Sequence, residues 1–143
     1  VRNIGAIARS AECAGVVAII LPLKGAAQLN EDAAKSSAGA LHKVPVCRHS
    51  NLVEVIDYLQ SSGIEVVGVT EKAVKSYFEI VLTLPLRLIM GNEYEVIAWD
   101  YLRKCNASVR IPMVGTIRSL NVSVATGILL FEVEKQRMNV AIG

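Results

Sequence analysis

The C-terminal stretch from Arg110 to Glu132, RIPMVGTIRSLNVSVATGILLFE, constrains the fold more than any other part of the sequence. It begins at the end of a predicted strand, residues 108–111, which Pro112 interrupts. Residues 119–121 predict the start of a helix, because Ser and Asn side chains accept hydrogen bonds from the free N–H groups of a first turn. The helix is apolar on nearly every face for about three turns, so we expect it to be buried. A buried helix does not need polar residues at its mouth, whereas a small-molecule site does. Those polar residues are Ser119, Asn121 and Ser123.

Helical patterns and short apolar runs alternate along the rest of the chain. This alternation predicts an α/β fold, with a mostly parallel sheet flanked by helices. The predicted helices cover residues 3–15, a short stretch near 30–35, 50–62, 98–104 and the segment after 119. The predicted strands cover residues 16–21, 44–47, 65–69, 80–82, 87–90 and 108–111. Ser50 is expected to cap the helix that follows it.

The composition indicates a single domain that lacks a transmembrane helix. The chain has 143 residues, of which 52% are hydrophobic and 20% charged, and no apolar run reaches about 18 residues. The apolar excess favours a sheet buried on both faces or a subunit interface. A net charge of +2 permits a nucleic-acid partner without requiring one. The three cysteines are widely spaced and odd in number, which indicates reduced thiols in a cytosolic protein: Cys13, Cys47 and Cys105.

Three polar loops follow predicted strands, at residues 70–72, 91–93 and 112–121. Ligands of open α/β sheets bind beyond the carboxyl ends of the strands, so we expect these loops to converge on one crevice. The sequence contains neither the glycine fingerprint of dinucleotide-binding proteins nor a phosphate-binding P-loop. His42 and His49 lack metal-ligand spacing, so no metal site is expected.

Three segments together resemble one protein family: residues 3–11, NIGAIARSA; residues 88–93, LIMGNE; and residues 111–125, IPMVGTIRSLNVSVA. The chain is similar to the catalytic domain of the SpoU (TrmH) RNA 2′-O-ribose methyltransferases of the SPOUT superfamily. The amino-acid sequences of the first and third segments most resemble those of the large-subunit ribosomal RNA guanosine-2′-O-methyltransferase (RlmB-type) branch. The resemblance extends over nearly the whole chain.

This resemblance implies a deep trefoil knot in the C-terminal part, which is a rare exception to the rule that chains do not knot. It also implies S-adenosyl-L-methionine as cofactor, a homodimer, and structured RNA as substrate, with ribosomal RNA favoured over transfer RNA. Residues 1–143 are expected to form the catalytic domain, with the first strand and any N-terminal RNA-binding domain outside the sequence. Candidate phosphate contacts are Arg2, Arg9, Lys24, Arg48 and Arg118.

The resemblance also assigns residues to the site. The expected catalytic set is Asn3, Arg9, Glu93, Ser119 and Asn121. The expected cofactor contacts are Gly91, Ile111 and Leu120, with Thr70 and Met113 as further candidates. A guanidinium stays protonated, with a pKa above about 12. We therefore interpret Arg9 as a phosphate clamp that stabilises the forming alkoxide, rather than as a base.

One position departs from the family pattern. Val96 stands where the family carries a glycine, three residues after the glutamate of the second segment. A β-branched residue is strained at a positive φ and occupies room that a glycine leaves open. The alternative hypothesis is therefore a non-catalytic module that keeps the knotted fold and binds RNA or cofactor. A third, weaker interpretation is an unrelated nucleotide-binding α/β domain.

Overall fold

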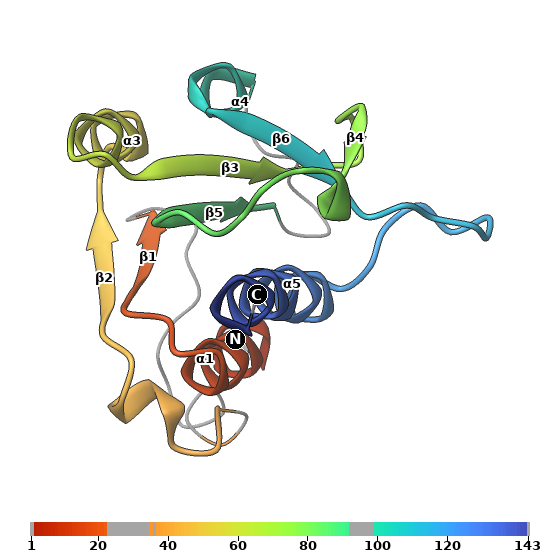
Figure 1. Ribbon diagram of the computed structural model, residues 1–143. Coiled ribbons are helices and arrows are strands. Elements are labelled where there is room, and N and C mark those ends of the chain that lie inside the picture. Colours follow the sequence, from red (N-terminus) through yellow and green to blue (C-terminus); the bar gives the residue numbers. More distant parts are fainter. Residues whose placement is uncertain (1, 23–34, 36, 92–98, 143) are drawn as a thin grey trace.

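The computed structural model describes residues 2–22, 35, 37–91 and 99–142 of the 143 in the chain. Its centre is a parallel four-stranded sheet in the order β4-β6-β3-β5, and a parallel pair, β1-β2, lies beside it (Figure 1). The predicted α/β fold with a mostly parallel sheet is thereby confirmed. The strands are β1 Ile19–Pro22, β2 Val46–His49, β3 Glu65–Val69, β4 Lys75–Ser76, β5 Leu86–Met90 and β6 Ala107–Arg110.

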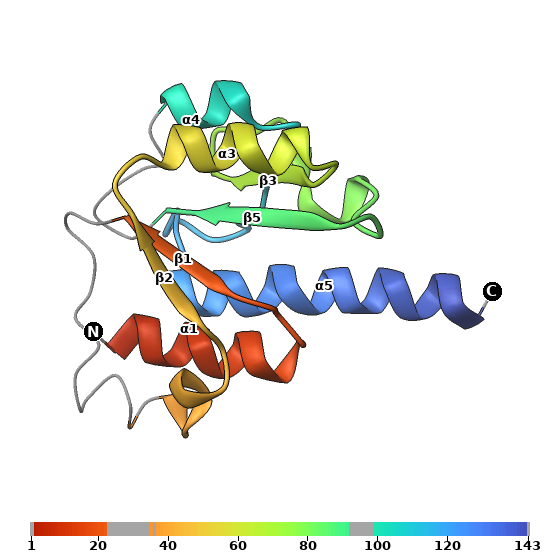
Figure 2. The ribbon, with the colours of Figure 1, turned by 90° about the vertical axis from the view of Figure 1, so that its left-hand side faces the viewer.

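Helices cover both faces of the four-stranded sheet. Helices α3 and α4 lie on one face and α5 lies on the other, while α1 packs along the side of α5 that faces away from the sheet (Figures 1 and 2). No helix in the described part of the chain is long and apolar enough to cross a lipid bilayer. The helices are α1 Arg2–Cys13, α3 Leu52–Ser61, α4 Trp99–Lys104 and α5 Val122–Ile142, with 3₁₀ turns η1 Ala40–His42 and η2 Tyr77–Glu79.

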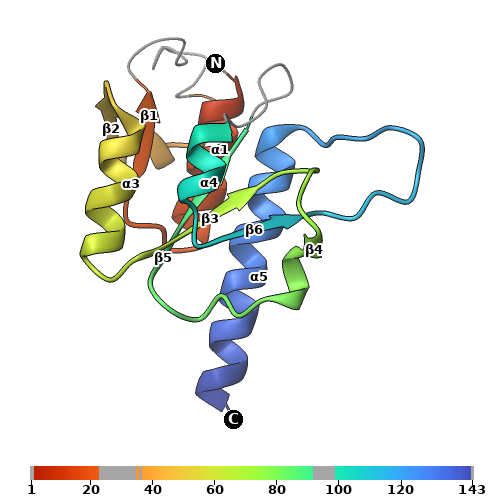
Figure 3. The same cartoon turned by 90° about the horizontal axis from the view of Figure 1, so that it is seen from above.

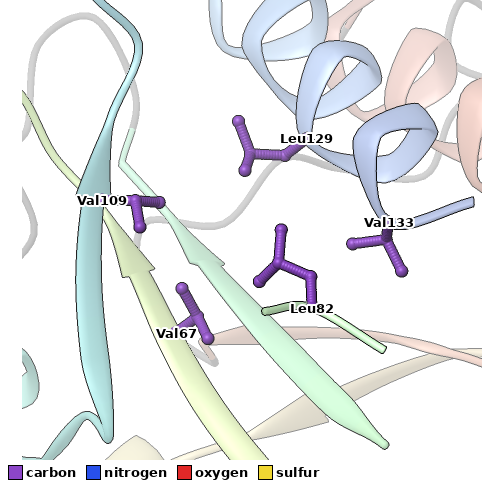
Figure 4. Packing of buried hydrophobic residues seen from close by; sticks show 5 residues of the cluster. All are labelled: Val67, Leu82, Val109, Leu129 and Val133. Atoms are coloured by element: carbon purple, nitrogen blue, oxygen red, sulfur yellow. The ribbon is translucent and has the colours of Figure 1, made fainter. Parts of the chain in front are cut away.

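The main core lies between this sheet and α5. Five residues form it, each at most 6% exposed: Val67, Leu82, Val109, Leu129 and Val133 (Figure 4). Val67 and Val109 point from neighbouring strands toward Leu129 and Val133 on the helix. Burying a side chain of this size stabilises the fold by about 1.5–3 kcal/mol, so this layer fixes α5 on the sheet.

Small residues allow α1 to pack closely against α5. Ile4, Ala8 and Ala11 are buried at spacings of four and three residues, which is one face of a helix. Ile7, one residue before Ala8, is only half-buried. Because α5 lies between the sheet and α1, two of its faces are covered, which accounts for most of its apolar surface.

The expectation that α5 is buried all round its first turns is wrong for part of its surface. Val124 is 51% exposed and Phe131 is 49% exposed. These side chains lie on the part of α5 that neither the sheet nor α1 covers.

Residues 80–82 do not form the strand that the sequence predicts. Their backbone groups bond instead to the side chain of Gln136 on α5, which accepts from the Leu82 N–H at 2.7 Å and donates to the Ile80 carbonyl at 3.1 Å. Arg137 also donates to the Leu84 carbonyl at 3.1 Å. Buried backbone groups need partners, and here a helix supplies the partners that a neighbouring strand would otherwise provide.

Several predicted boundaries shift by a few residues. Asn51, not Ser50, caps α3, because its Oδ1 accepts from the N–H groups of Val53 and Glu54 at 3.1 and 3.3 Å. The strand predicted at 16–21 is β1, at 19–22, and the strand predicted at 44–47 is β2, at 46–49. The short helix predicted near residues 30–35 lies mostly outside the described residues.

Candidate active site

Three strands of the central sheet end at the same level. Val69 at the end of β3 pairs with Met90 of β5 and with Val109 of β6. The residues that follow these partners therefore lie along one edge of the sheet, where open parallel sheets bind ligands. Thr70 and Gly91, the first residues of two of the predicted loops, therefore lie at one edge with Arg110, the last residue of the strand before the third loop.

A pocket of about 350 Å³ opens at this edge. This volume lies within the range of small-molecule sites, about 300–1,000 Å³. Of the expected cofactor contacts, Ile111 and Met113 line the pocket. Its other lining residues are Glu71, Arg110, Pro112 and Arg118. The pocket thus combines an apolar strip with two guanidinium groups and one carboxylate.

Thr70 shapes the turn that carries Glu71 to the pocket. The Thr70 N–H donates to the Val109 carbonyl at 2.9 Å, and the Thr70 Oγ1 accepts from the Lys72 N–H at 3.3 Å. Its side chain is buried beside the pocket without lining it. Gly91 is partly buried at the end of β5, and Leu120 is exposed.

A second polar contact joins the first turn of α1 to the residue that precedes α5. Asn121 Nδ2 donates to Asn3 Oδ1 at 3.0 Å, across 118 residues of sequence. The Asn121 Oδ1 accepts from the Ser123 N–H at 2.8 Å, so the same side chain caps α5 and reaches α1. These two residues were expected in one catalytic set, and the fold brings them into direct contact.

Other members of the expected set are placed differently. Arg9 is exposed on α1, and no hydrogen bond or ion pair within the described residues joins it to Asn3 or Asn121. Ser119 is exposed two residues before Asn121, which takes the helix-capping role. Glu93 and Val96 lie outside the described residues.

The chain matches the model of the SpoU rRNA Methylase family over residues 1–131. The chain belongs to the SpoU family. It is 44% identical over 135 residues to the 23S rRNA (guanosine-2′-O-)-methyltransferase RlmB of Photorhabdus laumondii, which covers 94% of this chain and 55% of that protein. The RlmB of Escherichia coli K12 is 43% identical, with 94% and 56% covered. The chain thus spans about half the length of these relatives.

Solved structures of SpoU proteins share the fold. The SpoU methyltransferase AviRb from Streptomyces viridochromogenes, in complex with the cofactor AdoMet, matches with a TM-score of 0.89 and 31% identity, over 96% of this chain and 56% of AviRb. The A. aeolicus TrmH/SpoU tRNA modifying enzyme matches with a TM-score of 0.88 and 28% identity, over 98% and 71%. The resemblance inferred from the three sequence segments is confirmed.

The pocket is also lined by two residues to which the sequence analysis gave no role, Glu71 and Arg110. Glu71 falls in one of the predicted polar loops, and Arg110 is the last strand residue before Pro112. Only the register of β6 against β3 and β4 shows that both side chains meet one pocket.

Among the described residues, neither histidines nor cysteines line the pocket. The His49 Nδ1 accepts from the Asn51 N–H at 3.0 Å, next to the start of α3. Burial raises the pKa of the Cys105 thiol, which keeps it protonated and poorly nucleophilic near neutral pH. The described residues contain no group of three or more His, Cys, Asp or Glu side chains placed to hold a metal ion.

Proposed function

We propose that residues 1–143 are the catalytic domain of an enzyme that uses S-adenosylmethionine to methylate a ribose 2′-hydroxyl of large-subunit ribosomal RNA. The names of the RlmB relatives support the substrate class. The observation that carries the proposal is the 3.0 Å bond from Asn121 to Asn3. It joins the first and third family segments, and Asn121 lies three residues after Arg118, which lines the pocket.

The pocket suits the proposed cofactor because Ile111, Pro112 and Met113 offer apolar surface to an adenosine. Bound there, S-adenosylmethionine would supply a methyl group already activated on a sulfonium. The proposed contacts are Gly91, Ile111, Leu120, Thr70 and Met113.

The residues of this chain would position the ribose and handle its charge. The bond between Asn3 and Asn121 fixes both amides, so that the Asn3 Nδ2 group can orient a hydroxyl. Holding reacting groups in line can remove about 7–11 kcal/mol from a barrier. Arg9 stabilises the negative charge that develops on the 2′-oxygen, and Ser119 completes the polar set. Glu93 is the only carboxylate in the set, so it is the group suited to take the proton.

A homodimer and a C-terminal knot are part of the same proposal. The half-exposed Val124 and Phe131 on α5 support an interface at this helix, because such side chains favour burial against a partner. Light scattering tests the dimer directly, and Phe131→Asp should yield monomers.

The test is transfer of labelled methyl groups to a 23S ribosomal RNA transcript, followed by mapping of the modified nucleotide. Arg9→Lys keeps the charge and loses the bidentate fork, so turnover should fall by about 10²-fold or more. Arg103→Lys on α4 is the matched control, because Arg103 pairs with Asp100 away from the pocket.

Two outcomes would contradict the proposal. Full activity of Arg9→Lys would remove the role assigned to Arg9. Calorimetric binding of S-adenosylhomocysteine without methyl transfer would instead indicate a non-catalytic module, and recovery of turnover in Val96→Gly would trace that loss to the departure at position 96.

A further inference from the structure

Two guanidinium groups at the pocket carry charge that the described residues leave unneutralised. Arg110 and Arg118 are both exposed and both line the pocket. Within the described residues, neither takes part in an ion pair, and neither does Glu71 on the same rim. By contrast, Arg103 and Lys104 elsewhere on the surface pair with Asp100 and Asp57 at 3.0 and 2.8 Å.

The two arginines reach the pocket from different supports. Arg110 is held at the end of β6, opposite Ser76 of β4. Arg118 belongs to the loop of residues 111–121, which projects away from the sheet before the chain returns to α5 (Figure 3). A ligand that bridges them would therefore tie this loop to the sheet.

We propose that Arg110 and Arg118 bind the RNA phosphate next to the ribose that is methylated. This inference rests on the proposed function. Arginine binds phosphate oxygens through parallel N–H groups, and such charge-assisted bonds are among the strongest available to a side chain. The whole chain carries a net charge of only +2, so phosphate binding must come from local pairs of this kind.

The position of the pair suits the reaction. Ile111 and Met113, proposed to contact the cofactor, line the same pocket and lie between the two arginines in sequence. In RNA the 2′-hydroxyl is next to the 3′-phosphate. A phosphate held on the rim therefore places the neighbouring hydroxyl over the pocket, which limits its freedom before methyl transfer.

A substitution at Glu71 distinguishes a bound RNA phosphate from the main alternative, the amino-acid end of the cofactor. A carboxylate on the rim repels a phosphate, so Glu71→Gln should tighten RNA binding roughly two- to fivefold at low salt. If the rim instead held the amino-acid end of the cofactor, Glu71 would pair with its ammonium group and the arginines with its carboxylate. Glu71→Gln would then weaken cofactor binding and leave RNA binding unchanged.

The experiment compares the double variant Arg110→Gln/Arg118→Gln with the double control Arg103→Gln/Lys135→Gln. Both remove two positive charges from exposed positions, and the control residues lie outside the pocket. The measurements are the affinity for a 23S ribosomal RNA transcript over a range of salt concentrations, and the calorimetric affinity for S-adenosylhomocysteine.

We expect the pocket variant to lose roughly tenfold or more in RNA affinity at low salt, with unchanged S-adenosylhomocysteine binding. The plot of log affinity against log salt should become shallower by about 0.7 for each phosphate of single-stranded RNA that the variant no longer neutralises. The control should change both quantities far less.

Equal RNA affinities of the two double variants would overturn the inference, and so would a loss confined to S-adenosylhomocysteine binding. Failure of the proposed function is distinguishable, because the unmodified protein would then transfer no methyl group to the transcript. A wild-type protein that transfers methyl groups, together with a pocket variant that behaves like the control, would reject the phosphate site alone.

Discussion

Two irregular segments adjoin α5, and they differ in how firmly they are bound to the rest of the fold. Residues 80–84 are anchored: Leu82 is 1% exposed, and α5 side chains bond the backbone on either side of it. Residues 111–121 project from the sheet, with Ile117 79% exposed and Val114 fully exposed. The anchored segment has its polar groups satisfied from within, while the projecting segment and its neighbour Arg110 leave charged groups available. One segment therefore stabilises the fold, whereas the other leaves its charged side chain at the rim of a pocket.

The largest expected effect on stability comes from the anchored segment. Leu82→Ala leaves a cavity in the layer between the sheet and α5, and should lower the free energy of unfolding by about 3–4 kcal/mol. Ile117→Ala in the projecting segment should change it by less than about 0.5 kcal/mol. Urea unfolding followed by circular dichroism measures both, and similar losses in the two variants would remove the contrast.

The projecting segment should show its effect in turnover. Asn121→Ala removes the bond to Asn3, and methyl transfer should fall by about 100-fold. Asn51→Ala is the matched control, since Asn51 caps α3 as Asn121 caps α5. Each change should cost about 1 kcal/mol of stability through its lost cap. Equal turnover of the two variants, measured in single-turnover assays, would show that Asn121 acts only as a cap.

The smallest of these effects is expected for Gln136, whose side chain bonds the backbone of the anchored segment. Gln136→Ala leaves the Leu82 N–H and the Ile80 carbonyl without their partner, and should destabilise the fold by about 1–2 kcal/mol. Asn139→Ala, at an exposed position on the same helix, should stay within about 0.5 kcal/mol. Thermal unfolding compares the two. An unchanged midpoint for Gln136→Ala would mean that water replaces the side chain and that the segment is anchored by Leu82 alone.

Local patterns in the sequence predicted much of the fold and less of the site. The strand at residues 65–69 has the predicted bounds. A buried parallel strand has a nearly continuous apolar sequence between turn residues, and this pattern can be recognised locally. The run Ile80-Val81-Leu82 carries the same local signal and is not a strand. What decides its structure is Gln136, which lies 54 residues away from Leu82. No pattern confined to a short window reports such a partner.

Some residues of the candidate site could likewise be predicted from the sequence, and others could not. Motif residues could be assigned from the resemblance, and the contact between Asn3 and Asn121 agrees with them. Arg110 and Glu71 could not be assigned from the sequence. They line the same pocket because of the register of neighbouring strands, which follows from the three-dimensional pairing rather than from residue spacing.

The bond between Asn3 and Asn121 also has a consequence for timing during synthesis. A ribosome adds roughly 5–20 residues per second, so the second amide is made about 6–24 seconds after the first. Until then α1 has no α5 to pack against and the paired amides do not exist. The contact between α1 and the start of α5 therefore forms only after residue 121 has been synthesised.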